Sequence, residues 1–141
     1  AFTWVLSSSG TAAELSAALL SLSGNKYVLL LVMNIIFLIA GCFVDSVSGF
    51  YIFLPILLPI VKNMDFSVYA FGVLMTANFA VGQVTPPVGS NLFVAVSIAK
   101  ITMKEILQKT GPFIVAGIIC LLLLTYIPQI ITVLPTLMGL K

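Results

Sequence analysis

The chain has no arginine, no histidine and very little charge of either sign. Charged residues make up 7% of its 141 residues, whereas an ordinary soluble domain has about 25%. Six lysines without arginine form no basic patch, so a nucleic-acid-binding protein is excluded. Without histidine there is no typical zinc site and no histidine base for hydrolytic chemistry.

Cysteine is also scarce. Cys42 and Cys120 stand far apart in apolar surroundings, which argues against a disulfide framework and favours two small apolar side chains. The chain begins at Ala1 without the pattern of a signal peptide. Residues 1–6 resemble the end of a spanning helix, so we expect the sequence to be a segment of a longer protein.

Enzyme signatures are missing as well. The segment from Ser46 to Gly49 superficially resembles an intramembrane serine protease motif, but it lacks the leading glycine and the chain has no histidine. Asp45 stands alone and cannot form the carboxylate pair of an aspartyl protease. The sequence therefore predicts a protein that is not an enzyme.

What the chain does contain is apolar sequence, at 61% of its residues, and this predicts an all-α, polytopic membrane protein. Residues 27–61 are uncharged apart from Asp45 and are too long for one helix across a core about 30 Å thick. Residues 41–49 hold glycines, serines and an acid, which favour a turn. Pro55 and Pro59 compete for that turn, but a proline inside a membrane helix often only kinks it.

We therefore predict a helical hairpin over residues 26–62 with its tip at residues 41–49. Each arm is then about 14 residues, or about 21 Å at 1.5 Å per residue, and falls short of the hydrocarbon thickness. Arms of that length indicate a re-entrant hairpin.

Residues 67–99 form the next apolar run, and two adjacent prolines divide it. Pro86 and Pro87 remove two backbone donors, so we predict a broken helix whose loop is residues 85–89, with halves at 68–84 and 89–99.

The remaining segments are assigned more simply. Residues 1–24 are expected to hold the end of a transmembrane helix and an interfacial helix over residues 11–23. Residues 100–110 are expected to form an interfacial arm helix. Residues 111–141 would hold the final transmembrane helix, at 112–131, and a tail. The lysines of residues 100–109 place that connector in the cytoplasm and the residue 62–67 turn on the other side.

Two helix breaks at one membrane depth predict a shared polar site. A break leaves backbone groups that need new partners, and unwound carbonyls and hydroxyls suit a hard cation such as Na⁺. The candidate oxygen ligands are the backbone at Gly41, Thr85 and Pro86 and the side chains of Asp45, Ser46, Ser48, Thr85 and Asn91. In the alternative interpretation the prolines only kink a helix, the glycines only permit close packing, and Asp45 is a solvated helix cap.

The order of these motifs resembles a known family. Gly41-x-x-x-Asp45 is followed by Pro55-Ile-Leu-Leu-Pro59, Phe71-Gly72-Val73, Asn78, Gly82, Thr85-Pro-Pro-Val-Gly89 and Asn91-Leu-Phe-Val94. This pattern is similar to the C-terminal third of the large membrane subunit of TRAP transporters, the tripartite ATP-independent periplasmic family. The Thr85–Gly89 block with the segment after it is its most specific part.

The resemblance implies a Na⁺-driven, elevator-type secondary transporter in the bacterial cytoplasmic membrane, built as an inverted repeat of which this chain holds one half. Its partners would be a small membrane subunit and a soluble periplasmic substrate-binding protein. Its substrates would be organic anions, such as C4-dicarboxylates or sialic acid. Carried over by position, the Na⁺ ligands would come from Gly41, Ser46, Thr85, Pro86 and Gly89, and the substrate contacts from Asp45, Ser48 and Asn91.

A second hypothesis stays open from the sequence alone. The same breaks would also suit a channel, or an accessory structural subunit in which they line a pore or form a docking seam.

Overall fold

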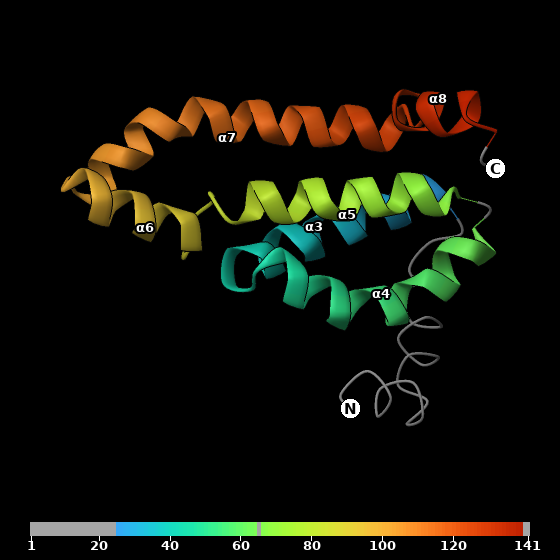
Figure 1. Ribbon diagram of the computed structural model, residues 1–141, viewed down its shortest axis with the longest axis horizontal. Helices are drawn as coiled ribbons and strands as arrows, with labels where there is room; N and C mark the ends of the chain where they lie inside the picture. Colours follow the sequence, from blue (N-terminus) through green and yellow to red (C-terminus); the bar gives the residue numbers. More distant parts are fainter. Residues whose placement is uncertain (1–24, 65, 140–141) are drawn as a thin grey trace.

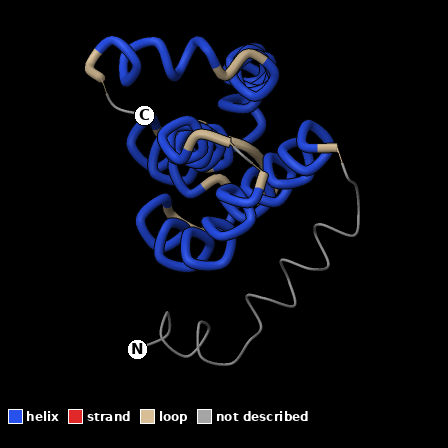
Figure 2. Tube along the Cα trace, turned by 90° about the vertical axis from the view of Figure 1, so that its right-hand side faces the viewer, coloured by secondary structure: helices blue, strands red, loops and turns tan. Residues whose placement is uncertain are grey.

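The computed structural model describes residues 25–64 and 66–139, and in these residues it contains helices and loops but no strand (Figure 2). The helices are α3 (Lys26–Phe43), α4 (Ser46–Asn63), α5 (Val68–Gly82), α6 (Ser90–Ala99), α7 (Met103–Tyr126) and α8 (Gln129–Leu137). Among the described residues α3, α4 and α7 are long and apolar enough to cross a membrane. The all-α membrane fold is thus confirmed. The predictions for residues 1–24 lie outside the described residues.

The hairpin turn between α3 and α4 is shorter than predicted. Only Val44 and Asp45 separate the two helices, and both have extended backbones. The glycines and serines of residues 41–49 continue the helices instead of forming the turn. Each arm therefore has 18 residues, or about 27 Å, so the expectation of 14-residue arms is wrong. Arm length no longer argues for a re-entrant hairpin, which stays a prediction.

Pro55 and Pro59 lie inside α4, so the choice of the earlier turn is confirmed. The break between α5 and α6 is also confirmed, although its loop is residues 83–89. Helix α5 ends at Gly82, two residues before the predicted end, because the next amides bond to nearer carbonyls. The Thr85 N–H donates to the Gly82 carbonyl at 2.9 Å.

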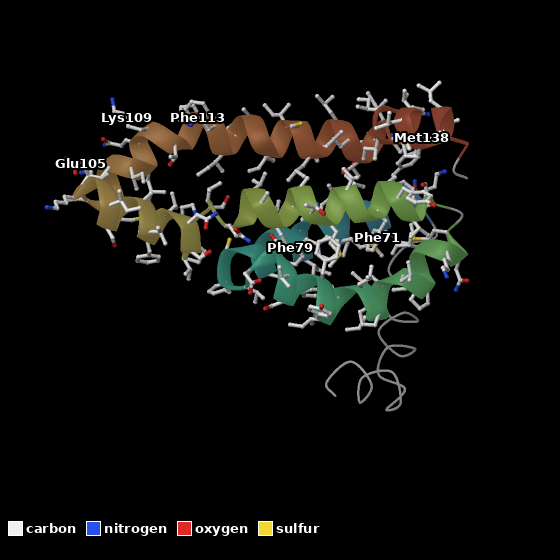
Figure 3. The ribbon with its side chains drawn as sticks, viewed as in Figure 1. Phe71, Phe79, Glu105, Lys109, Phe113 and Met138 are labelled. Carbon is white, nitrogen blue, oxygen red and sulfur yellow. The ribbon has the colours of Figure 1, made fainter. Side chains whose placement is uncertain are left out.

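The prediction of a separate interfacial helix at residues 100–110 is wrong. Thr102 and Glu105 form a capping box that starts α7, and the helix then continues through Pro112 to Tyr126. A proline removes one backbone donor, and a helix accommodates this loss by bending. Figure 3 shows the bend in α7 near Lys109 and Phe113.

The predicted end of this helix at residue 131 is also wrong. Ile127 leaves the helical region, and Pro128 starts the separate helix α8. The lysine-bearing start of α7 and the C-terminal end of α4 lie at opposite ends of the molecule (Figure 1). This arrangement agrees with the prediction that the residue 100–109 connector and the residue 62–67 turn face opposite sides. Which of them faces the cytoplasm stays a prediction.

The core lies where α5 packs against α3 and α4. Phe37 of α3 contacts Phe53, Phe71 and Phe79, with ring centroids 5.6 to 5.9 Å apart. Figure 3 shows Phe71 and Phe79 between the ribbons of α5 and α4. By contrast, the outer face of α7 is apolar and open, with Phe113 78% exposed. Through Phe79, this aromatic core packs against Gly41 and Gly49, on either side of the α3–α4 turn.

A buried chain of hydrogen bonds joins α7 to this core. The Asn78 amide donates to Asn34 Oδ1 at 2.8 Å, and the Asn34 amide donates to Thr125 Oγ1 at 2.6 Å. All three side chains are buried. Such bonds between membrane helices contribute about 0.6–1.7 kcal/mol each.

We expect Thr125→Val to lower the free energy of unfolding by about 0.6–1.7 kcal/mol, because the Asn34 amide loses its acceptor. Thr132→Val is the matched control. Both threonines donate to the carbonyl four residues earlier, but Thr132 takes no part in the buried chain. Thermal unfolding in detergent measures the difference, and an equal loss in the two variants would contradict the assignment.

Candidate functional site

The two helix breaks contact each other directly. The Gly89 N–H donates to the Cys42 carbonyl at 3.1 Å, and Cys42 Sγ lies 3.6 Å from the Pro86 carbonyl oxygen. Figure 1 shows the α3–α4 turn beside the α5–α6 break, part-way along the length of α7. The two breaks therefore occupy one place in the fold.

Three glycines make this contact possible by close packing. A Cβ on Gly82 would lie 2.8 Å from Gly41 Cα and 3.0 Å from the Leu38 carbonyl oxygen. A Cβ on Gly49 would lie 2.2 Å from the Phe79 ring. The packing interpretation is thus correct for Gly41 and Gly49. It does not compete with a site, because the packing is what brings the breaks together.

Thr85 has the hydrogen-bonding state that a cation ligand needs. Its hydroxyl donates to the Val81 carbonyl at 2.6 Å, so the proton points into α5 and the lone pairs of Oγ1 point elsewhere. Gly89 has φ of +59° and begins α6 without a side-chain cap. A side chain there would meet the Thr85 carbonyl at 3.0 Å, so glycine is required for this turn.

Ser46 and Asn91 are joined by a residue that the sequence reasoning missed. Gln83 Nε2 donates to Ser46 Oγ at 2.9 Å, and Asn91 Nδ2 donates to Gln83 Oε1 at 3.1 Å. The Asn91 N–H also donates to the Gln83 carbonyl at 3.2 Å. Gln83 thus connects the first turn of α4 to the first turn of α6. A glutamine three residues before the two prolines was the only available signal.

Asp45 and Ser48 are exposed and bond to each other at the start of α4. The Ser48 N–H donates to Asp45 Oδ2 at 3.1 Å, which makes Asp45 the N-cap. The cap interpretation is therefore confirmed. A role in substrate binding stays a prediction.

We expect Asp45→Ala to lower the stability of the fold measurably, because the Ser48 N–H loses its acceptor. Asp45→Asn keeps a capping oxygen and is expected to change stability little. Denaturation of the two variants measures this difference. Unchanged uptake and Na⁺ dependence in Asp45→Asn would limit the acid to capping.

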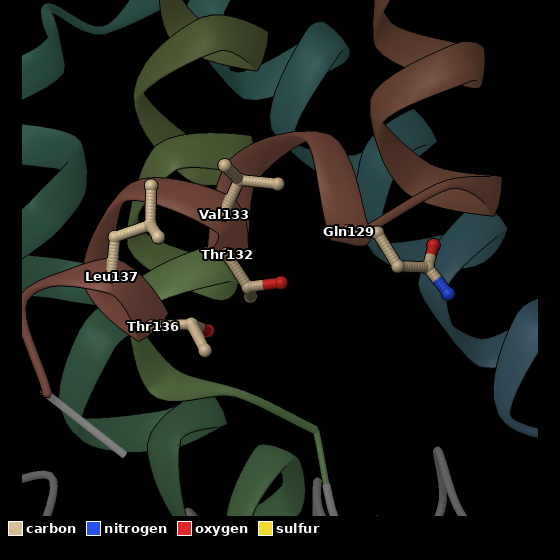
Figure 4. A pocket seen from close by; sticks show the side chains of 5 residues that line it. All are labelled: Gln129, Thr132, Val133, Thr136 and Leu137. Atoms are coloured by element: carbon tan, nitrogen blue, oxygen red, sulfur yellow. The ribbon is translucent and has the colours of Figure 1, made fainter.

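A cavity of about 180 Å³ lies beside the two breaks. Its lining comes from the end of α3, the proline loop and α7: Leu38, Ile39, Cys42, Phe43, Thr85, Pro86, Pro87 and Ile118. A second cavity, of about 320 Å³, is lined only by α8 at the opposite end of the molecule (Figures 1 and 4). Only the first brings predicted site residues together.

Neutral oxygens dominate the site. In the described part of the chain, no three His, Cys, Asp or Glu side chains could hold a metal ion together. Apart from the Asp45 carboxylate, the oxygens near the breaks belong to hydroxyls, amides and backbone carbonyls, which suit Na⁺ better than a transition metal.

Comparison with known proteins identifies the family of the chain. Residues 1–130 match the family model described as the tripartite ATP-independent periplasmic transporter, DctM component. The chain belongs to this DctM family. The description of this family is that of a transporter component.

Three relatives are longer proteins, and the chain matches a part of each. It is 39% identical over 116 residues to the isethionate TRAP transporter permease DctMQ of Oleidesulfovibrio alaskensis, covering 82% of this chain and 18% of the relative. It is 31% identical over 138 residues to the C4-dicarboxylate large permease DctM of Rhodobacter capsulatus. This match covers 98% of this chain and 31% of the relative. It is 30% identical over 118 residues to the sialic acid permease SiaT of Haemophilus influenzae. This match covers 84% of this chain and 19% of the relative. The chain thus spans less than a third of each relative.

Proposed function

We propose that the chain is the site-bearing C-terminal part of a Na⁺-coupled permease that takes up an organic anion across the bacterial inner membrane. The main support for this proposal is the contact between the two helix breaks, where Gly89 bonds to Cys42 and Gln83 bonds to Ser46. Broken helices that meet inside the membrane supply the unpaired backbone and hydroxyl oxygens that ion-coupled transporters use.

The Na⁺ would be held by oxygens from both breaks. Thr85 Oγ1 offers free lone pairs because its proton is donated to α5. Ser46 contributes a hydroxyl from the start of α4, and the backbone of Gly41, Pro86 and Gly89 would complete the coordination. This assignment is supported by the closeness of the two breaks and by the absence of competing acidic clusters among the described residues.

The anion would bind beside the Na⁺ at the start of α6. A helix N-terminus carries partial positive charge, which favours an anionic ligand. Helix α6 starts without a side-chain cap, and Asn91 stands in its first turn. Ser48 would contribute from the start of α4, where Asp45 holds its backbone.

The substrate class and the partners follow from the family. The names of the relatives refer to isethionate, C4-dicarboxylates and sialic acid, which are all organic anions. The substrate proposed here is a small carboxylated anion, such as a C4-dicarboxylate or sialic acid. The family description is of a tripartite, periplasmic system, which supports a small membrane subunit and a periplasmic binding protein as partners in an elevator-type cycle.

The test is uptake by the complete transporter, reconstituted with both partners in liposomes. Radiolabelled C4-dicarboxylate and sialic acid are offered separately, with a Na⁺ gradient or with choline in its place. We expect uptake of one anion only in Na⁺. Undiminished uptake in choline would overturn the coupling, and single-channel conductance would favour the channel hypothesis.

A further inference from the structure

Gln83 occupies a position that the Na⁺ and substrate assignments do not use. It ends α5, where its backbone N–H donates to the Phe79 carbonyl at 2.9 Å, and its side chain is half-buried between the other two helices. Its amide has one partner on each side, Ser46 at 2.9 Å and Asn91 at 3.1 Å. One planar group therefore joins α4, α5 and α6.

The bridge does not depend on which way the amide is placed. If the oxygen and nitrogen of Gln83 exchange positions, the Ser46 hydroxyl can donate to the oxygen. The Asn91 amide can turn to accept from the nitrogen. Either arrangement fixes the orientation of Ser46 and Asn91 relative to each other.

We propose that Gln83 is the positioning residue that couples the Na⁺ ligand Ser46 to the substrate contact Asn91. This inference rests on the proposed function. A cation on Ser46 Oγ fixes that hydroxyl, and the fixed hydroxyl orients the Gln83 amide. The amide in turn holds the Asn91 side chain toward the start of α6. Bound Na⁺ thus prepares the anion site, and by linkage the bound anion strengthens Na⁺ binding to the same degree.

The test compares Gln83→Met with Gln108→Met in the complete reconstituted transporter. Methionine keeps the length of glutamine but has no amide, and Gln108 is an exposed glutamine on α7. The substrate KM is measured from low to saturating Na⁺. We expect the KM of wild type and Gln108→Met to fall by about fivefold or more as Na⁺ rises, and that of Gln83→Met to stay nearly constant. An ordinary structural defect would lower the maximal rate without removing this dependence.

A second variant covers the case in which Gln83→Met fails to fold. Gln83→Glu keeps the shape and places a carboxylate beside Ser46. It is expected to lower the Na⁺ concentration for half-maximal uptake and to raise the KM for the anion, because the carboxylate attracts the cation and repels the substrate. Wild-type uptake that does not depend on Na⁺ would overturn the proposed function itself. Two outcomes would overturn only the role of Gln83, provided that wild-type uptake depends on Na⁺. In the first, the KM of Gln83→Met falls with Na⁺ as it does in the wild type. In the second, Gln83→Glu leaves both the Na⁺ requirement and the KM for the anion unchanged.

Discussion

Gly82→Ala is expected to reduce uptake about 5- to 150-fold, the range that corresponds to 1–3 kcal/mol. The new Cβ would lie 2.8 Å from Gly41 Cα and 2.9 Å from the Gly41 carbonyl carbon. These are backbone atoms of a packed helix and cannot rotate away, so α3 and α5 must separate. Overpacking of this kind costs about 1–3 kcal/mol, and separation weakens the bonds from Gly89 and Gln83 across the two breaks.

The matched control is Gly72→Ala on the same helix. A Cβ at Gly72 meets no described atom within 4 Å, and alanine in a helix interior is favoured over glycine by about 0.5–1 kcal/mol. We expect Gly72→Ala to keep uptake and stability. Uptake and thermal unfolding of both variants are measured together. Equal uptake by the two variants would show that the close contact of α5 with α3 at Gly82 does not position the site.

Thr85→Val is expected to raise the Na⁺ concentration for half-maximal uptake by about tenfold or more. Valine keeps the branched shape but has no oxygen, and a neutral group bound to an ion contributes about 1.5–3 kcal/mol. Ser46→Ala is expected to act in the same direction. Na⁺ titrations of the initial uptake rate measure the change.

Thr76→Val provides the control for Thr85→Val. Thr76 also lies on α5 and donates to the carbonyl four residues earlier, at 2.8 Å. It is exposed and lies nine residues before Thr85, so its loss removes the same local bond but no proposed ligand. An unchanged Na⁺ requirement in Thr85→Val would remove Thr85 from the site. If Thr76→Val raised the Na⁺ requirement equally, the effect would come from a lost bond within α5 and not from a lost Na⁺ ligand.

The positions of the two breaks could be predicted because their causes are local. Pro86 and Pro87 cannot donate backbone hydrogen bonds wherever the chain is placed, so the α5 helix had to end near them. Asp45 caps a helix through the residue three positions later, which is also a local feature. These residues were enough to locate both breaks within a few positions.

The roles of the glycines could not be predicted in the same way. Gly41 and Gly49 were expected to form the turn, but two extended residues suffice for it, and the glycines pack against α5 instead. The same limit applies to Gln83 and Ser46, which are 37 residues apart in sequence, and to Asn34 and Thr125, which are 91 apart. Such contacts depend on helix packing, which a pattern in one segment does not encode.

Helix α7 shows a second limit of the sequence-based prediction. The three lysines of residues 100–109 led to the prediction of a separate interfacial helix, because charges often mark the membrane interface. Proline is tolerated within membrane helices. The capping box at Thr102 gives the helix a strong start, and a bend accommodates the missing donor.

The central claim is that the two breaks together bind Na⁺. The most direct measurement is thermal unfolding of the purified permease in NaCl and in choline chloride at equal ionic strength. Wild type is expected to gain about 2.7 kcal/mol when Na⁺ reaches about 100 times its Kd, and the Thr85→Val, Ser46→Ala double variant is expected to gain nothing. A wild type that Na⁺ does not stabilise, or a double variant that it stabilises equally, would contradict the claim.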